Sequence, residues 1–181
     1  MRMNATTLVF AAGLGMWAGI VAAAPEAAAG DKATKANAQT FLSKVAQANL
    51  AEVELGKLAA EKAESAEIKR YGQKMVDDHG KANKEVQTLA DQKGVTLPTY
   101  LDAAHKAAKA RLEKLSGDAF DRAFIAQMVR DHQAALALFR TQARSGKDPD
   151  VKAFAEKMRP DLEGHLKMAM DLSRQQRAAS R

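Results

Sequence analysis

Four long stretches of this 181-residue chain repeat apolar residues at intervals of three and four, which is the spacing of one face of an α-helix. Ala, Lys, Glu, Leu and Gln are abundant and only 4 residues are proline, so the composition favours helix almost everywhere. The pattern predicts helices over about residues 37–63, 66–93, 118–146 and 149–173. The fold class is therefore all-α, in one domain large enough to bury a core.

The segment between the second and third long helices has a different character. Val95-Thr96-Leu97-Pro98 is expected to be extended, since the residue before a proline avoids the α region. A short helix, capped by Thr99, is predicted from Tyr100 to Leu115. This connection is long enough to cross the length of a bundle.

An internal repeat relates the two halves of the chain. Residues 49–75 match residues 132–158 without a gap, since 132 − 49 and 158 − 75 are both 83. Each half then forms a helical hairpin, and the long crossover joins them. The sequence predicts a ferritin-like four-helix bundle, made of two hairpins and a crossover that contains a short helix.

The first 29 residues are typical of a secretory signal peptide. Arg2 precedes an apolar run over residues 7–24, and small residues follow it, so cleavage is expected after Ala24 or Ala29. Residues 30–36 are predicted to be a polar leader, residues 37–173 the bundle and residues 174–181 a polar tail. The mature protein is expected in the periplasm, with no transmembrane segment after cleavage. The absence of cysteine excludes disulfides and a lipid anchor.

The net charge of +6 is spread along the helices among acidic residues, as on a solvated helix surface. With 5% aromatic residues and an export signal, nucleic acid is not an expected partner. A weak contact of the basic tail with the anionic envelope surface stays open, and the oligomeric state does not follow from the sequence.

The motif Met-Val-x-Asp-His occurs at residues 75–79 and again at residues 128–132. Its histidines, His79 and His132, occupy positions where the apolar stripe calls for an aliphatic residue. His165 does the same in the last helix, and Glu52 does so in the first. Distances counted from the expected hairpin turns, together with the repeat, put these four residues within one helical turn of height, about 5 Å. One polar layer is therefore predicted to cross all four helices.

Burying these groups without partners would cost several kcal/mol, so they must bond one another, water or a metal ion. We predict a metal site whose ligands are Glu52, His79, His132 and His165. The expected cofactor is a transition metal ion, copper or iron being preferred, with zinc and manganese as further candidates. A metal-free, hydrogen-bonded layer is the alternative.

Three acidic residues are candidates for orienting the imidazoles. Asp78 and Asp131 precede their histidines and are rotated from them by about 100° on the helix, so each can reach an imidazole of a neighbouring helix. Glu163 stands in a similar relation to His165, although a solvated position fits it equally well.

Three methionines lie three or four residues from a layer histidine and share its helical face, namely Met75, Met128 and Met168. A thioether beside an imidazole suits Cu(I), although a methionine also fills gaps in an ordinary core. His105, on the crossover helix, is expected to be structural or to face solvent.

The chain resembles an exported bacterial family of ferritin-like domains of unknown function, whose members are often labelled outer-membrane proteins. The resemblance covers about residues 38–172 and rests on five motifs: Glu52-Val-Glu-Leu-Gly-Lys-Leu-Ala59, Met75-Val-Asp-Asp-His79, Leu115-Ser-Gly-Asp-Ala-Phe-Asp121, Met128-Val-Arg-Asp-His132 and Leu162-Glu-Gly-His165. It implies a four-helix bundle and an envelope location, and it supplies no reaction.

Three functions are compatible with these features. The first is a periplasmic protein that binds a transition metal for metal buffering or stress response, and the second is a metal-free envelope interaction module. The third, an oxidoreductase with an atypical dinuclear centre, is disfavoured because the Glu-x-x-His pairs of di-iron bundles are missing: Val76, Val129 and Leu162 stand three residues before the layer histidines. A binding protein is thus favoured over an enzyme.

Overall fold

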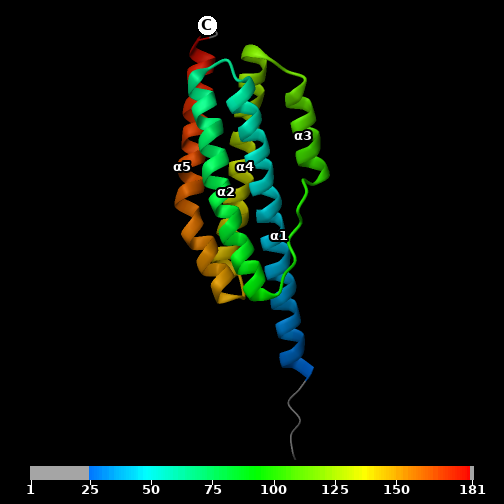
Figure 1. The fold of residues 1–181 in the computed structure, drawn as a ribbon. Coiled ribbons are helices and arrows are strands. Elements are labelled where there is room, and N and C mark those ends of the chain that lie inside the picture. Colours follow the sequence, from blue (N-terminus) through cyan, green and yellow to red (C-terminus); the bar gives the residue numbers. More distant parts are fainter. Residues whose placement is uncertain (1–24, 180–181) are drawn as a thin grey trace, which may run out of the picture.

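The computed structural model describes residues 25–179 of the chain, and all of its regular structure is helical within that range. The helices are α1 (Pro25–Lys62), α2 (Ala66–Lys93), α3 (Ala103–Glu113), α4 (Gly117–Ser145) and α5 (Pro149–Ala179) (Figure 1). Residues 1–24, which hold most of the predicted signal peptide, lie outside the described residues, as do residues 180–181.

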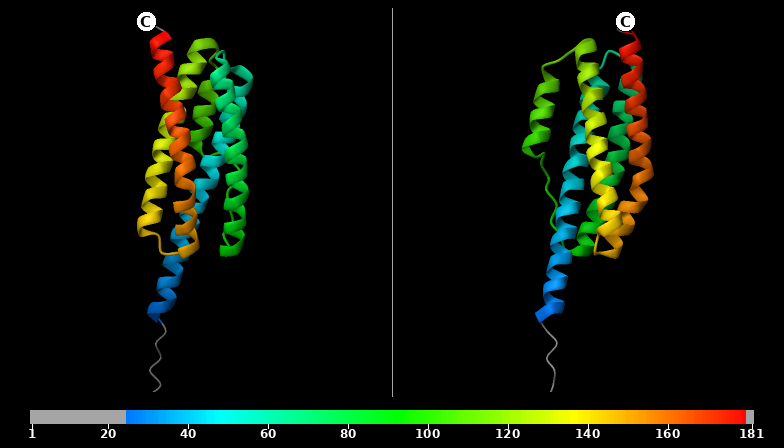
Figure 2. Two further views of the ribbon diagram at one scale, coloured as in Figure 1. Left: turned by 90° about the vertical axis from the view of Figure 1, so that its left-hand side faces the viewer. Right: turned by 180° about the vertical axis from the view of Figure 1, so that it is seen from behind.

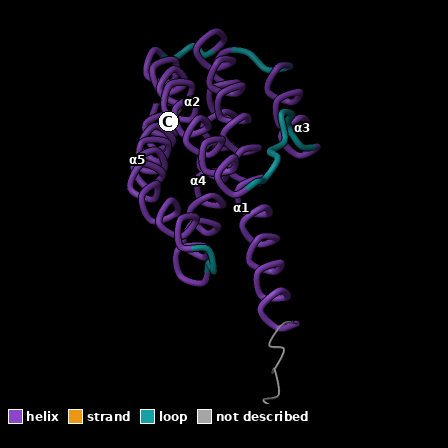
Figure 3. Tube along the Cα trace, turned by 60° about the horizontal axis from the view of Figure 1, so that its bottom comes forward, coloured by secondary structure: helices purple, strands orange, loops and turns teal. Residues whose placement is uncertain are grey.

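The four long helices form two antiparallel hairpins, α1 with α2 and α4 with α5. The hairpins pack against each other through α1 with α4 and α2 with α5, and α3 lies outside α1 and α4 (Figure 2). The hairpin turns are short, whereas residues 94–102 run back along the bundle in an extended path (Figure 3). The predicted all-α bundle of two hairpins with a helix-containing crossover is confirmed.

Local sequence signals explain where most helices begin and end. The Ser65 hydroxyl accepts a hydrogen bond from the Ile68 backbone N–H at 3.4 Å and caps α2, and Gly94 ends α2 in the left-handed conformation with φ of 60°. The Asp148 carboxylate accepts from the Val151 N–H at 3.1 Å at the start of α5. These three boundaries match the prediction.

The crossover helix α3 begins later than predicted. Asp102, and not Thr99, is its N-cap, and its carboxylate accepts from the backbone N–H of His105 at 2.8 Å. Thr99 and Asp102 can both cap a helix and lie three residues apart, and Asp102 is the one that forms the cap.

The first and last helices are longer than the apolar pattern predicts. α1 begins at Pro25, so the polar leader at residues 30–36 is helical, and α5 continues through Pro160 to Ala179. Residues 30–36 lie mostly exposed where α1 extends beyond the bundle (Figure 1). Such a mostly exposed segment carries no apolar stripe, but its alanines and lysines still favour helix. None of the helices that the structure describes combines the length and the apolarity needed to cross a membrane.

The core consists of two apolar clusters at different heights of the bundle. One contains Phe41, Leu42, Val86, Phe139 and Val151, near the α4–α5 turn. The other contains Leu55, Ile68, Met75, Phe120, Phe124 and Met128, near the α1–α2 turn. The buried polar residues Asn49, Glu52, His79, His132 and His165 lie between these two clusters.

Close approach of α1 and α2 helps to fix this layer. A Cβ atom at Gly56 would lie 2.6 Å from the Gly72 carbonyl oxygen, so only glycine allows the two backbones to meet here. Gly56 is one helical turn from Glu52, so the contact sets the spacing of α1 and α2 next to the polar layer.

Candidate metal centre

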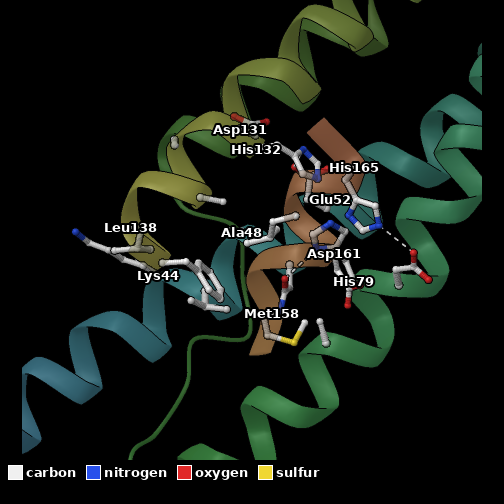
Figure 4. A pocket seen from close by; sticks show the side chains of 18 of the residues that line it. Lys44, Ala48, Glu52, His79, Asp131, His132, Leu138, Met158, Asp161 and His165 are labelled. Atoms are coloured by element: carbon white, nitrogen blue, oxygen red, sulfur yellow. Dashed lines mark hydrogen bonds and ion pairs between the residues drawn. The ribbon is translucent and has the colours of Figure 1, made fainter. Parts of the chain in front are cut away.

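Three histidines from three different helices meet in the polar layer. His79 on α2, His132 on α4 and His165 on α5 are 5%, 1% and 4% exposed. Their ring centroids lie 5.5 Å apart for His79 and His132, 5.3 Å for His79 and His165, and 5.4 Å for His132 and His165 (Figure 4). The structure thus brings together the three histidines that the sequence placed in one layer.

One nitrogen of each ring is held by an oxygen acceptor. His132 Nδ1 lies 2.9 Å from the Met128 carbonyl oxygen, and His165 Nε2 lies 2.9 Å from Asp78 Oδ2. His79 Nδ1 lies 2.9 Å from Asn49 Oδ1. Because these oxygens accept hydrogen bonds, the nitrogen that faces each one carries the proton, and the other nitrogen keeps its lone pair.

The nitrogens that keep a lone pair are the ones without a partner. His79 Nε2, His132 Nε2 and His165 Nδ1 are all buried and have no hydrogen bond. One ligand atom from each ring lies within 4.8 Å of the other two. Metal–nitrogen bonds of about 2.0–2.1 Å require nitrogens roughly 3.3–3.6 Å apart, so small inward ring rotations complete a three-nitrogen site. The donor set therefore fits a transition metal ion.

The histidines are held neutral by their surroundings. Burial lowers the pKa of His79 to about 3, with repulsion from His132 and His165 adding to the effect. Burial also lowers the pKa of His132 to about 4, against the opposing hydrogen bond to Met128, and it lowers the pKa of His165 against the opposing Asp78 carboxylate. At neutral pH all three lone pairs are thus free of protons.

Glu52 is buried beside this cluster but is not one of its members. It is 4% exposed, its Oε1 lies 3.7 Å from His132 Nδ1, and its Oε2 has no partner. Burial, with repulsion from Asp131 added, raises its pKa well above the usual value. The Glu52 carboxyl group therefore lies near the nitrogen of His132 that carries the proton.

The three acidic candidates have different positions. Asp78 orients an imidazole of a neighbouring helix, as predicted, through its bond to His165. Burial alone would raise the pKa of Asp78, but hydrogen bonds from Lys74 and His165 outweigh it and lower that pKa. Asp131 instead accepts from Gln127 Nε2 at 2.9 Å, and Glu163 is exposed and pairs with Arg140 at 3.2 Å.

The three predicted methionines all lie on one side of the layer. Met75 and Met128 belong to the cluster near the α1–α2 turn, and Met168 packs against it. Because α2 and α4 run in the same direction and α5 runs oppositely, a methionine before His79 or His132 and one after His165 reach the same height. Met158, which was not a candidate, is the methionine that lines the cavity on the other side.

That cavity has a volume of about 310 Å³ and is lined by the three histidines, by apolar side chains and by a few polar groups. The imidazoles and Glu52 gather at one end, and Lys44 and Leu138 lie toward the other (Figure 4). Two of its residues were missed in the sequence. His105 lines the cavity from α3, and Asn49 forms the hydrogen bond that holds the His79 ring. Asn49 could have been found from the internal repeat, in which it corresponds to His132.

Comparison with known protein families identifies the family of this chain. Residues 23–172 match the model of a domain of unknown function, DUF4142. The chain belongs to the DUF4142 family. No curated protein matches the sequence significantly. The expected membership of a family of unknown function is therefore confirmed, while export of this DUF4142 protein stays a prediction.

Several solved structures resemble this DUF4142 protein in fold. CopM in its Cu(II)-bound form aligns with a TM-score of 0.65 and 19% identity, over 76% of this chain and 96% of that chain. A DUF305 fragment from Deinococcus radiodurans aligns with a TM-score of 0.67 and 17% identity, over 76% and 96%. A DUF305 protein of Streptomyces coelicolor, described as secreted, gives 0.65 and 12%, over 79% and 93%. At these identities the likeness establishes the shared fold.

Proposed function

We propose that this DUF4142 protein binds one transition metal ion through His79, His132 and His165, for metal buffering or stress response in the periplasm. The proposal is carried by one observation: three neutral, buried imidazole nitrogens in one cluster have no hydrogen-bond partner, while the opposite nitrogen of each ring is held. A protein that needed only packing would place aliphatic side chains at these positions.

The donor set favours copper. Three imidazoles without a carboxylate suit copper and zinc better than manganese, which prefers oxygen ligands. Iron, the other preferred ion, gains less support, because the cluster of possible ligand atoms consists of three imidazoles and Glu52 lies beside it, 3.7 Å from His132 Nδ1. CopM, which has a similar fold, exists in Cu(II)-, Cu(I)- and Ag-bound forms, and this supports copper for the present chain.

The chain's own residues hold and shield the ion. Asn49, the Met128 carbonyl and Asp78 fix the rings, and such supporting hydrogen bonds typically change metal affinity by about 10–100-fold. The apolar cluster near the α1–α2 turn limits the access of water from that side of the layer. Glu52 is the sole carboxylate buried in the layer, so storage fits this site better than the carboxylate-rich chemistry of di-iron enzymes.

Metal titration of the purified protein tests the proposal. We expect one equivalent of copper per chain by elemental analysis after dialysis. Copper at 100 times its Kd should raise the free energy of unfolding by about 2.7 kcal/mol, which is roughly 5–10 °C in Tm for a domain of this size. A protein without stoichiometric metal, whose Tm is unmoved by Cu, Zn, Fe or Mn, would refute the proposal and leave the metal-free interaction module.

Matched histidine variants locate the site. His132→Leu should abolish the copper-dependent rise in Tm, because it removes one of three ligands. His105→Gln alters the histidine of the described chain that lies outside the cluster, and it should keep full copper binding. An equal loss of copper binding in both variants would mean that the metal is not held by the three-histidine cluster.

A further inference from the structure

The cavity beside the histidines is larger and more apolar than a metal site alone requires. Its walls include Val45, Leu138, Phe139, Phe154 and Leu162. A cavity of about 150 Å³ holds one benzene molecule, so the 310 Å³ here suits an apolar body of roughly ten to twelve heavy atoms. Pockets of this size, with few polar groups, commonly bind small organic molecules.

The histidine cluster borders this cavity on one side of the polar layer. All three histidines line it, whereas the opposite side of the layer is filled by side chains such as Met75 and Met128, which are 0% exposed. An ion held by three protein nitrogens keeps at least one coordination position for a further ligand. The cavity is the side of the layer with room for that ligand.

The far end of the cavity gives access from the surface. Lys44 on α1 and Ala134 on α4 both line the cavity, and both are exposed. The seam between α1 and α4 is covered from outside only by α3 and the extended crossover, within the part of the chain that the structure describes. A small molecule can therefore enter without separation of the two helices of either hairpin.

We propose that the cavity and the ion form one binding site for a small organic ligand. Its apolar body of one or two rings lies in the cavity, and its lone-pair donor, such as an azole nitrogen or a thiolate, occupies the open position on the ion. This inference rests on the proposed metal binding, and it extends that function from metal storage to binding of a metal-anchored small molecule.

A pair of probes of equal size tests the inference on the copper-loaded full chain. 4-Phenylimidazole has a lone-pair nitrogen, whereas 1-phenylpyrrole has the same shape and no donor. We expect 4-phenylimidazole to bind once per copper, with a shift of the Cu(II) visible band and an added nitrogen coupling in the electron paramagnetic resonance spectrum. 1-Phenylpyrrole should bind at least ten-fold more weakly.

A variant that fills the cavity supplies the second arm. Ala48 lines the cavity on α1 without contacting copper in the proposal, and Ala48→Leu adds bulk into existing space. Ala48→Leu should keep one copper per chain, which reports that it is folded, and should weaken 4-phenylimidazole at least ten-fold. Plain imidazole, which needs little of the cavity, should weaken less.

The outcomes separate the two proposals. If copper binds but 4-phenylimidazole does not, or strips the copper, the ligand site is refuted and metal storage stands. Equal binding of both probes, or unchanged binding in Ala48→Leu, also overturns the ligand site. If no copper binds, metal storage itself fails, and the metal-anchored ligand falls with it.

Discussion

Replacing His132 by leucine should stabilise the metal-free protein, although it destroys the candidate site. His132 is 1% exposed and its Nε2 has no partner. Its Nδ1 bonds to the Met128 carbonyl, one turn earlier in the same helix, so the variant leaves that carbonyl in its normal helical bond. An unpaired buried polar atom costs about 1–3 kcal/mol, and leucine of similar size removes it.

His79→Leu is the matched comparison, since it also removes a buried ring but leaves the hydrogen-bond partner of that ring, Asn49, without its bond. Asn49 Oδ1 would lose its hydrogen bond to His79, and Asn49 Nδ2 already has none. The gain from removing one unpaired nitrogen is then offset by a newly unpaired oxygen. We expect a free energy of unfolding within about 1 kcal/mol of the unchanged protein, or below it.

Urea unfolding of the chelator-treated proteins at pH 7 measures both effects. The midpoint for His132→Leu should rise by an amount equivalent to about 1–3 kcal/mol at unchanged slope. Copper should then stabilise the unchanged protein and not the variant. A His132→Leu protein that is less stable than the unchanged protein by 1 kcal/mol or more would refute the reasoning, because the loss would mean that His132 Nε2 has a favourable partner in the unchanged protein.

Three further predictions follow from the same geometry. Asp78→Asn, which alters the carboxylate that orients an imidazole, should weaken copper about 10–100-fold in a chelator competition, whereas the surface variant Glu163→Gln should leave the affinity unchanged. Copper affinity should change little from pH 7 to 5, because burial lowers the pKa of His79 to about 3 and that of His132 to about 4 and also lowers the pKa of His165, so protons compete weakly in this range. Imidazoles at the ordinary pKa of 6.5 would instead each cost about 25-fold over that range, and a loss of this size would contradict the low pKa values. Gly56→Ala should destabilise by about 1–3 kcal/mol in thermal unfolding, since its Cβ meets the Gly72 carbonyl at 2.6 Å; Gly80→Ala, with nothing within 4 Å, should gain about 0.5–1 kcal/mol, and equal effects would argue against a tight α1–α2 contact.

Helical spacing was sufficient to predict the bundle and the layer. His79, His132 and His165 interrupt apolar stripes, and a residue in a stripe can point only toward the core. Counting from the hairpin turns gave their heights, because antiparallel helices of equal rise keep residues level. The orientation of Asp78 toward a neighbouring helix followed from the same geometry.

The details that the sequence did not reveal depend on side-chain packing. Spacing puts Glu52 in the layer, yet it does not say which face of His132 the carboxyl group meets. Spacing puts methionines one turn from the histidines, but only packing decides which side of the layer is filled and which is hollow. His105 lies on the crossover, whose path no periodic pattern determines.

The candidate ligands are divided between the two hairpins, with His79 from the first and two histidines from the second. An ion bound there is a cross-link between parts of the chain that pack less extensively on each other than within themselves. Such a cross-link opposes the separation of the hairpins and has little effect on fraying at the helix ends. Amide hydrogen exchange at the α1–α4 and α2–α5 seams should then be slower when metal is bound than when it is absent. The ion would thus add a direct link to two hairpins that already share their apolar core, and its loss would weaken the seam between them before it weakened either hairpin.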